Sequence, residues 1–181
     1  MVPGAGTVSG ILRENLDYPL VVKEPAVDQG DIFQQFEAIL REKLGKSYDE
    51  YAVPPPVFKE MEGEFLELDL GAGTLTARFP VLVKFFNPYH TLQGEIVAAA
   101  ADNTLGPLSV LVAPPNLTRR MEITYARPVT ADVGRITVKA RFLERNESLL
   151  YFRADLYDPE GQRLARVKAT HWIMADPPGG R

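Results

Sequence analysis

Apolar residues in the first part of the chain recur at helical spacing. Over residues 28–45 they fall on one stripe of a helix, consisting of Ile32, Phe33, Phe36, Ile39, Leu40 and Leu44. We therefore predict an amphipathic helix that packs on the main body, with Asp28 or Asp31 as its cap and Gly45 as its end. No period is sustained before this helix, and three consecutive prolines end at residue 56. These features predict an N-terminal extension over residues 1–56.

Beyond this boundary the hydrophobic period changes to two, which is typical of strands. Residues 65–70 and 74–79 alternate and are joined by Gly71-Ala72-Gly73, which predicts a hairpin. In the first strand we expect the three leucines, Leu66, Leu68 and Leu70, to face one side and Phe65, Glu67 and Asp69 the other. Four later segments also alternate or follow a turn, and they predict a meander of long strands: residues 121–125, 136–142, 150–156 and 164–173.

A long helix interrupts these strands, from about residue 93 to residue 112, with Gly106-Pro107 as a predicted kink or end. It is apolar nearly all round, so we expect it to be buried. Two strands, one helix and a strand meander predict an α+β fold, in which an antiparallel sheet of about five to six strands wraps around one long central helix. The predicted main domain spans residues 57–175, and residues 176–181 form a C-terminal tail.

Composition excludes several kinds of chemistry. The 181 residues contain no cysteine, so thiolate nucleophiles, cysteine-ligated zinc and iron–sulfur clusters are ruled out. A net charge of -4 lacks the basic excess of nucleic-acid-binding proteins, and we expect no nucleic-acid partner. The chain shows no signal-peptide pattern and no long uninterrupted apolar run, so we expect a cytoplasmic protein without membrane association. No histidine and carboxylate pair has ligand spacing on a helix, and we expect neither a metal nor a cofactor.

Two polar features stand out in the long helix. Its start, around Gly94, offers unpaired N–H groups and partial positive charge, and a glycine there lets a ligand approach the backbone. Asp102 lies in an otherwise apolar stretch, where an unpaired carboxylate is costly to bury. The alternatives are that Gly94 only permits close packing and that Asp102 is a hydrogen-bonded core residue.

The pattern Asn87-x5-Gln93-Gly94-x7-Asp102-Asn103, followed by the strand residues 121–125 and the meander, resembles a known family. It is similar to the hotdog-fold acyl-CoA thioesterases of the phenylacetate-pathway type and their mammalian thioesterase-superfamily relatives. The resemblance extends over residues 62–174. It implies a hotdog fold and hydrolysis of an acyl-CoA to a carboxylic acid and free coenzyme A, the latter being present only as part of the substrate.

The resemblance also implies roles for individual residues. Asp102 would activate a water molecule or attack as the carboxylate, and the Gly94 N–H would polarise the thioester carbonyl. Asn87 would orient the substrate, and Thr118 would help to hold the water. The expected substrate-binding residues are Gln93, His90, Glu95, Arg119 and Arg120.

The chain departs from the family pattern at two positions. Gln93 stands in place of the usual histidine, and Glu95 stands in place of the second glycine. The negative charge of Glu95 suits a helix N-terminus but opposes an oxyanion that forms beside it. A non-catalytic acyl-CoA binding protein is therefore an alternative, and a hydratase or dehydratase of the same fold is a third. His171 on the final strand is expected to be structural.

Helix geometry adds a condition. Gly94 and Asp102 are eight residues apart, so about 12 Å separates them along the helix. One carbonyl cannot contact both, and we therefore expect a homodimer with shared active sites, joined edge to edge through its sheets, or a homotetramer built from such dimers. Three roles remain open for the extension: it could cap an acyl tunnel, mediate tetramers or only shield the sheet.

Overall fold

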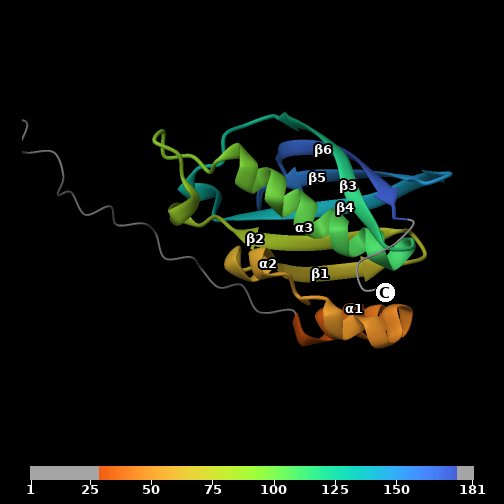
Figure 1. The fold of residues 1–181 in the computed structure, drawn as a ribbon. Coiled ribbons are helices and arrows are strands. Elements are labelled where there is room, and N and C mark those ends of the chain that lie inside the picture. Colours follow the sequence, from red (N-terminus) through yellow and green to blue (C-terminus); the bar gives the residue numbers. More distant parts are fainter. Residues whose placement is uncertain (1–28, 175–181) are drawn as a thin grey trace, which may run out of the picture.

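The computed structural model describes residues 29–174. In chain order its elements are α1 (Gln29–Leu44), the 3-10 helix η1 (Gly45–Glu50), α2 (Pro56–Glu60), β1 (Glu64–Asp69), β2 (Thr74–Pro80), η2 (Val83–Phe85), α3 (Gly94–Val112), β3 (Asn116–Tyr125), η3 (Ala131–Val133), β4 (Arg135–Asn146), β5 (Leu149–Tyr157) and β6 (Arg163–Ile173). The six strands form one antiparallel sheet in the order β1-β2-β4-β5-β6-β3, and α3 lies across it (Figure 1). This confirms the predicted architecture.

The predicted first helix is also present. Gly45 ends α1 with a positive φ of 55°, a conformation that glycine adopts without strain. Asp31 lies inside α1 and so is not its cap, while Asp28 and the predicted tail 176–181 lie outside the described residues. After Gly45 the chain continues as η1.

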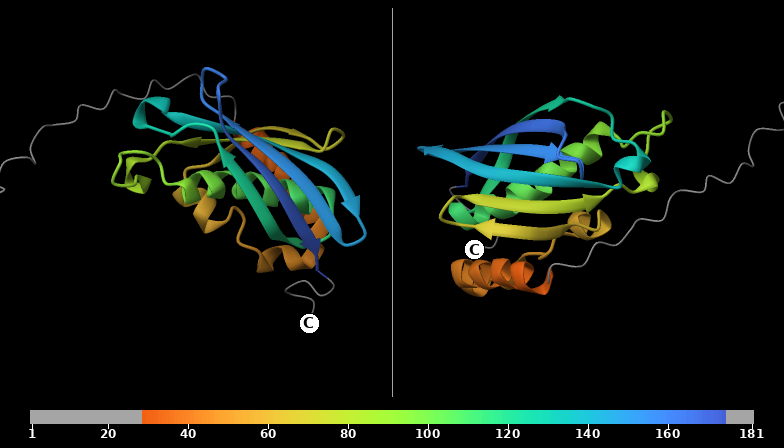
Figure 2. Two further views of the ribbon diagram at one scale, coloured as in Figure 1. Left: turned by 90° about the horizontal axis from the view of Figure 1, so that it is seen from above. Right: turned by 180° about the vertical axis from the view of Figure 1, so that it is seen from behind.

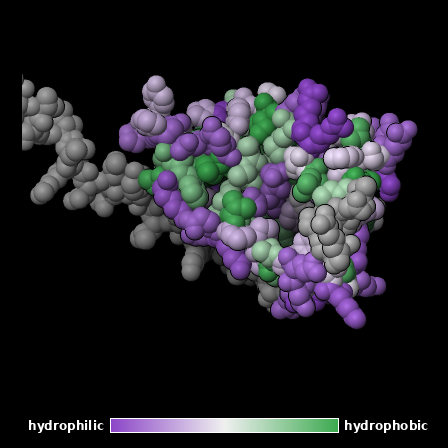
Figure 3. Space-filling view, in the orientation of Figure 1, coloured by the Kyte–Doolittle hydropathy of each residue, from purple (hydrophilic) through white to green (hydrophobic). Residues whose placement is uncertain are grey.

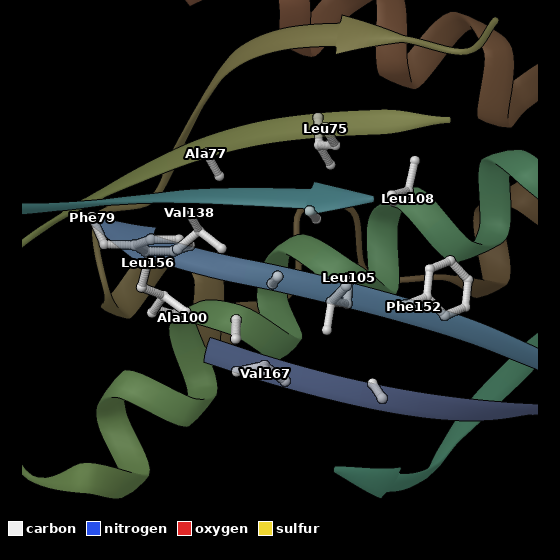
Figure 4. Close-up of a cluster of buried hydrophobic side chains, with 14 of the residues drawn as sticks. Leu75, Ala77, Phe79, Ala100, Leu105, Leu108, Val138, Phe152, Leu156 and Val167 are labelled. Carbon is white, nitrogen blue, oxygen red and sulfur yellow. The ribbon is translucent and has the colours of Figure 1, made fainter. Parts of the chain in front are cut away.

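One face of α3 forms the centre of the core. Ala100, Leu105 and Leu108 are at most 1% exposed and face Leu75, Val138 and other side chains of the sheet (Figure 4). Alanines on this face let the helix approach the strands closely, and the sheet curves around it (Figure 2). The opposite face is only partly covered, however, and Asp102 is exposed. The expectation that α3 is buried all round, Asp102 included, is therefore wrong for the single chain, because the sheet covers only one side.

The length and composition of α3 would also suit a membrane-crossing helix. An 18-residue stretch of this helix has a mean hydropathy of 1.2, and half of that stretch is buried inside the protein. Burial against a sheet accounts for that apolar composition, since the core helix of a soluble protein has the same properties. Figure 3 shows polar and apolar side chains mixed on the molecular face that carries α3.

The alternation in β1 differs from the prediction. Phe65 is 5% exposed and pairs with Ala77, Leu68 pairs with Leu75, and the register shifts between residues 65 and 67. A bulge at Leu66 therefore puts Phe65 and Leu68 on the core side together. Leu66 is only partly buried and Leu70 is 42% exposed, so the three leucines do not share a buried face.

The N-terminal segment is anchored through aromatic contacts. The rings of Phe36 and Phe65 lie 5.2 Å apart in an edge-on arrangement, and those of Phe33 and Phe65 are stacked at 6.1 Å. Lys43 Nζ donates hydrogen bonds to the carbonyls of Leu111, at 2.9 Å, and Ala113, at 2.6 Å. A cation that binds the last carbonyls of a helix also complements its dipole. Helix α1 is thereby fixed to β1 and to the C-terminal end of α3.

The bulge predicts unequal effects of truncation along β1. Phe65→Ala removes a buried ring and should lower the free energy of unfolding by about 3–5 kcal/mol. Leu70→Ala changes an exposed side chain and should lower it by about 0.5 kcal/mol or less. Urea denaturation of both variants measures the difference. Equal losses would mean that Phe65 does not face the core.

Candidate functional site

Asp102 on α3 meets Thr118 on β3. The hydroxyl of Thr118 donates a hydrogen bond of 2.9 Å to Asp102 Oδ1, and both side chains are exposed. Thr118 faces the helix because β3 contains a bulge at Arg119: Thr118 pairs with His171, whereas Arg120 pairs with Thr170. Bulges often re-aim a side chain next to a functional site.

His171 on β6 extends this contact into the interior. It is 1% exposed, and its Nε2 lies 3.3 Å from Thr118 Oγ1. Its Nδ1 lies 2.9 Å from Asn116 Oδ1. The Asn116 amide nitrogen donates to the carbonyls of Ser109 and Pro114, so its oxygen is the group that faces the ring. A polar chain therefore runs from the exposed Asp102 through Thr118 and His171 to Asn116.

Burial lowers the pKa of His171 because it disfavours the charged imidazolium, while the charge of Asp102 acts in the opposite direction. The sequence-based expectation gave His171 only a structural role and did not include Asn116. The two residues are far apart in sequence, and only the pairing of β3 with β6 brings them together. No local motif signals this contact.

Gly94 begins α3 at the other end of the helix, so its N–H has no partner within the helix. Tyr125, at the end of β3, donates a hydrogen bond of 2.8 Å to the Gly94 carbonyl. A Cβ atom at Gly94 would lie 3.1 Å from the Tyr125 hydroxyl oxygen, so a glycine is favoured here by close packing as well. Both sequence interpretations of Gly94 are therefore compatible with the structure. Tyr125 was missed as a residue that positions the helix start.

The two residues that depart from the family pattern flank this position. Gln93 and Glu95 are both exposed, and Gln93 is the helix cap but makes no side-chain capping bond. Burial raises the pKa of Tyr125, and the charge of Glu95 raises it further. The charge of Glu95 therefore acts electrostatically on Tyr125, which lies beside the first peptide groups of α3.

The loop before α3 is organised by Asn87. Its Oδ1 accepts hydrogen bonds from the backbone N–H groups of Tyr89, at 2.9 Å, and Thr91, at 3.2 Å. Its Nδ2 donates to Thr91 Oγ1 at 2.8 Å. His90 occupies the turn with a φ of 59° and is exposed. In this structure the Asn87 side chain supports the turn, and its role toward substrate stays a prediction.

Arg119 and Arg120 are exposed on β3. Arg120 forms an ion pair with Glu122. It pairs with Thr170 on β6, so it lies on the face of β3 opposite to the one that carries Thr118. The chain therefore brings neither arginine to Asp102, and their predicted contacts with substrate remain untested.

Asp102 and Gly94 line two separate cavities. Asp102, Thr118 and His171 line one of about 390 Å³, whereas Gly94 and Tyr125 line another of about 330 Å³. Gly94 and Asp102 lie eight positions apart on one continuous helix, so about 12 Å along its axis separates the two residues within one chain. Over residues 29–174, no group of three or more His, Asp or Glu side chains could hold a metal ion.

Neither a protein-family model nor a curated protein sequence matches the chain. Solved structures do match. A phenylacetic acid degradation-related protein of Ralstonia eutropha, described as a candidate thioesterase, is 24% identical with a TM-score of 0.63. The match covers 75% of this chain and 98% of that one.

Two further structures are similar. The PaaI protein from the phenylacetic acid degradation operon of E. coli is 12% identical, with a TM-score of 0.64 over 77% of this chain and 96% of its own. A Streptococcus mutans protein with bound acetyl-CoA is 15% identical, with a TM-score of 0.56 over 61% of this chain and 86% of its own. At these identities the likeness establishes the fold, and the chain has the hotdog fold of these structures.

Proposed function

We propose that the protein is an acyl-CoA thioesterase that hydrolyses the thioester with a water molecule guided by Asp102. The hydrogen bond from Thr118 to Asp102 Oδ1 is the observation that supports this most directly, because it fixes an exposed carboxylate beside a cavity. The fold it shares with a candidate thioesterase and with an acetyl-CoA-bound protein is consistent with such a substrate.

The reaction needs one base and one donor to the oxyanion. Asp102 takes a proton from water as the oxygen attacks the thioester carbonyl carbon. The carbon–sulfur bond then breaks, the acid is released, and the proton from water goes to the coenzyme A sulfur. Thr118 keeps the carboxylate in position throughout, since its only hydroxyl proton is directed to Asp102 Oδ1.

The oxyanion is held by the Gly94 N–H of the second subunit. This N–H points from a helix N-terminus, where the dipole favours negative charge. One chain cannot supply both groups to one carbonyl because of their separation along α3. The proposed homodimer pairs two copies along β3, whose outer side is bonded to no other strand within residues 29–174, and so contains two equivalent sites.

Glu95 favours one competing function. Its exposed carboxylate sits in the first turn of α3, where it opposes a developing oxyanion. A protein disabled in this way would bind acyl-CoA without cleaving it. Acyl-CoA would then raise the thermal midpoint of unfolding but stay intact on prolonged incubation, whereas the proposed enzyme releases free thiol.

The general base predicts a large loss of activity in Asp102→Asn. The amide keeps the size of the side chain but cannot take a proton, so kcat should fall roughly 100- to 10,000-fold. A thiol reagent that detects released coenzyme A measures this across acetyl-, decanoyl- and palmitoyl-CoA. Asp49→Asn is the matched control, because Asp49 is exposed and lies on η1. Unchanged turnover in Asp102→Asn would refute the role of this carboxylate.

The shared site predicts complementation between two inactive variants. Gly94→Pro removes the N–H at the first helical position, where proline is tolerated, and the ψ of 141° at Gln93 suits a residue that precedes proline. When Gly94→Pro and Asp102→Asn are co-expressed equally, half of the dimers carry one intact site, so about one quarter of the wild-type activity should return.

Gly94→Ala is the control for this experiment, because it adds the Cβ atom but keeps the N–H. It should retain more activity than Gly94→Pro. No recovery in verified mixed dimers would show that Gly94 and Asp102 do not act in one site across two chains.

The polar chain predicts a pH-dependent stability. The Asn116 oxygen requires a proton on His171 Nδ1, so Nε2 of the neutral ring carries none. Because burial lowers the pKa of His171 below 6.5 in the folded state, the unfolded chain binds the proton more readily. The stability that the neutral ring contributes is present above about pH 6.5 and is lost as the pH falls through the folded pKa.

Thermal midpoints at pH 7.5 and pH 5, measured at one protein concentration, test this. Wild type and His90→Gln, which changes the exposed histidine, should lose more stability on acidification than His171→Gln. Equal losses in all three proteins would contradict the assigned protonation state.

A further inference from the structure

The cavity of about 390 Å³ next to Asp102 extends well beyond the polar groups. Its other walls are mostly apolar and come from α1, from the loop that precedes α2 and from the half-exposed face of α3. Cavities of this size, mostly apolar with a few polar groups on one wall, are typical of sites for small organic ligands. An occupant that reaches Asp102 could therefore continue into apolar surroundings.

The α3 wall of the cavity follows one line along the helix. Asp102, Gly106 and Val110 all line it, and their spacing of four residues places them on the same face. Each step is one helical turn, so the lined stretch runs about 12 Å from Asp102 toward the C-terminal end of α3. An elongated wall of this kind suits a linear chain better than a single ring.

Gly106 is the feature that keeps this wall open. A Cβ atom built there would meet no atom within 4 Å, so packing does not demand a glycine. Glycine and proline both destabilise a helix interior, yet Gly106 and Pro107 stand side by side in α3 and both line the cavity. A ligand that occupies the space beside Gly106 and Pro107 would explain why two helix-destabilising residues stand there.

The opposite wall is fixed in place. Phe33, Phe36 and Leu40 of α1 line the cavity, and the first two contact the Phe65 ring. Lys43 ties the end of α1 to the carbonyls of Leu111 and Ala113. The wall is therefore held to both β1 and α3. A wall that limits the length of a ligand must be fixed in this way.

We infer that residues 29–57 form the outer wall of an acyl-chain pocket and that the substrates are linear aliphatic acyl thioesters of medium or greater length. This inference rests on the proposed function. The acyl tail runs from Asp102 past Gly106 to Val110 in the same subunit that supplies the carboxylate. Of the three roles open for the extension, capping the acyl tunnel is the one that the cavity supports.

A binding experiment on the full-length protein tests the pocket without any catalysis. A dansyl-labelled undecanoic acid serves as the probe, and decanoate displaces it. Gly106→Leu should weaken binding of both at least tenfold, because its side chain projects into the open space. Gly106→Ala is the matched control, favours the helix and should stay within about threefold of wild type.

The second measurement is the chain-length profile of kcat/KM, from acetyl- to palmitoyl-CoA, with phenylacetyl-CoA added. In wild type it should rise roughly two- to fourfold per methylene until the pocket is full. Gly106→Leu should move the maximum to shorter chains. Val110→Phe lies one turn further from Asp102 and should move the maximum less. This variant replaces Gly106→Leu in the test if the thermal midpoint shows that Gly106→Leu is not folded.

The outcomes separate this inference from the proposed function. If no thioester is hydrolysed but Gly106→Leu loses fatty-acid binding, the pocket stands and the enzymatic proposal fails. If hydrolysis occurs while the folded pocket variants keep both the wild-type binding and the wild-type profile, the pocket is refuted and the enzyme stands. A wild-type preference for phenylacetyl-CoA over decanoyl-CoA would also overturn the inference.

Discussion

The packing of one face of α3 against the curved sheet is the constraint on which the rest of the structure depends. Small and branched apolar side chains bury that face, and the opposite face of the same rigid helix must then point away from the sheet. Asp102 and Gly106 lie on that uncovered side. The helix also fixes the separation of Gly94 and Asp102, so no side-chain movement can join the two half-sites within one chain. In the proposed dimer, a second copy supplies the missing half and covers the outer edge of the sheet at β3.

The layer arrangement could be predicted from the sequence, because the hydrophobic period reports directly which positions are buried. The bulges could not. Thr118 and Tyr125 are seven residues apart, and plain alternation would place them on opposite sides of β3. The extra residue at Arg119 reverses this, so Thr118 reaches Asp102 while Tyr125 reaches the carbonyl of Gly94. A bulge depends on how a strand pairs with its neighbour, which local sequence does not encode, and the same limit misplaced Phe65 in β1.

The sequence revealed the candidate site only in part, for a related reason. Gly94 and Asp102 share one helix, so their spacing could be read directly from the chain. The support behind Asp102 is built by β3 and β6, where Asn116 and His171 become neighbours through strand pairing. A buried histidine is tolerated there because Nδ1 of its neutral ring donates a hydrogen bond to Asn116 Oδ1.

Gly106-Pro107 lies within α3 and still carries information about the candidate site. The pair predicts a kink or an end of the helix, and the end is wrong because α3 continues to Val112. Leucines of the core face on both sides of the pair, Leu105 and Leu108, are fully buried, so tertiary packing outweighs the local preference. Packing explains why the helix survives but not why two destabilising residues are present. Sequences depart from local consistency mainly where a site requires it, and here both residues line the cavity that begins at Asp102.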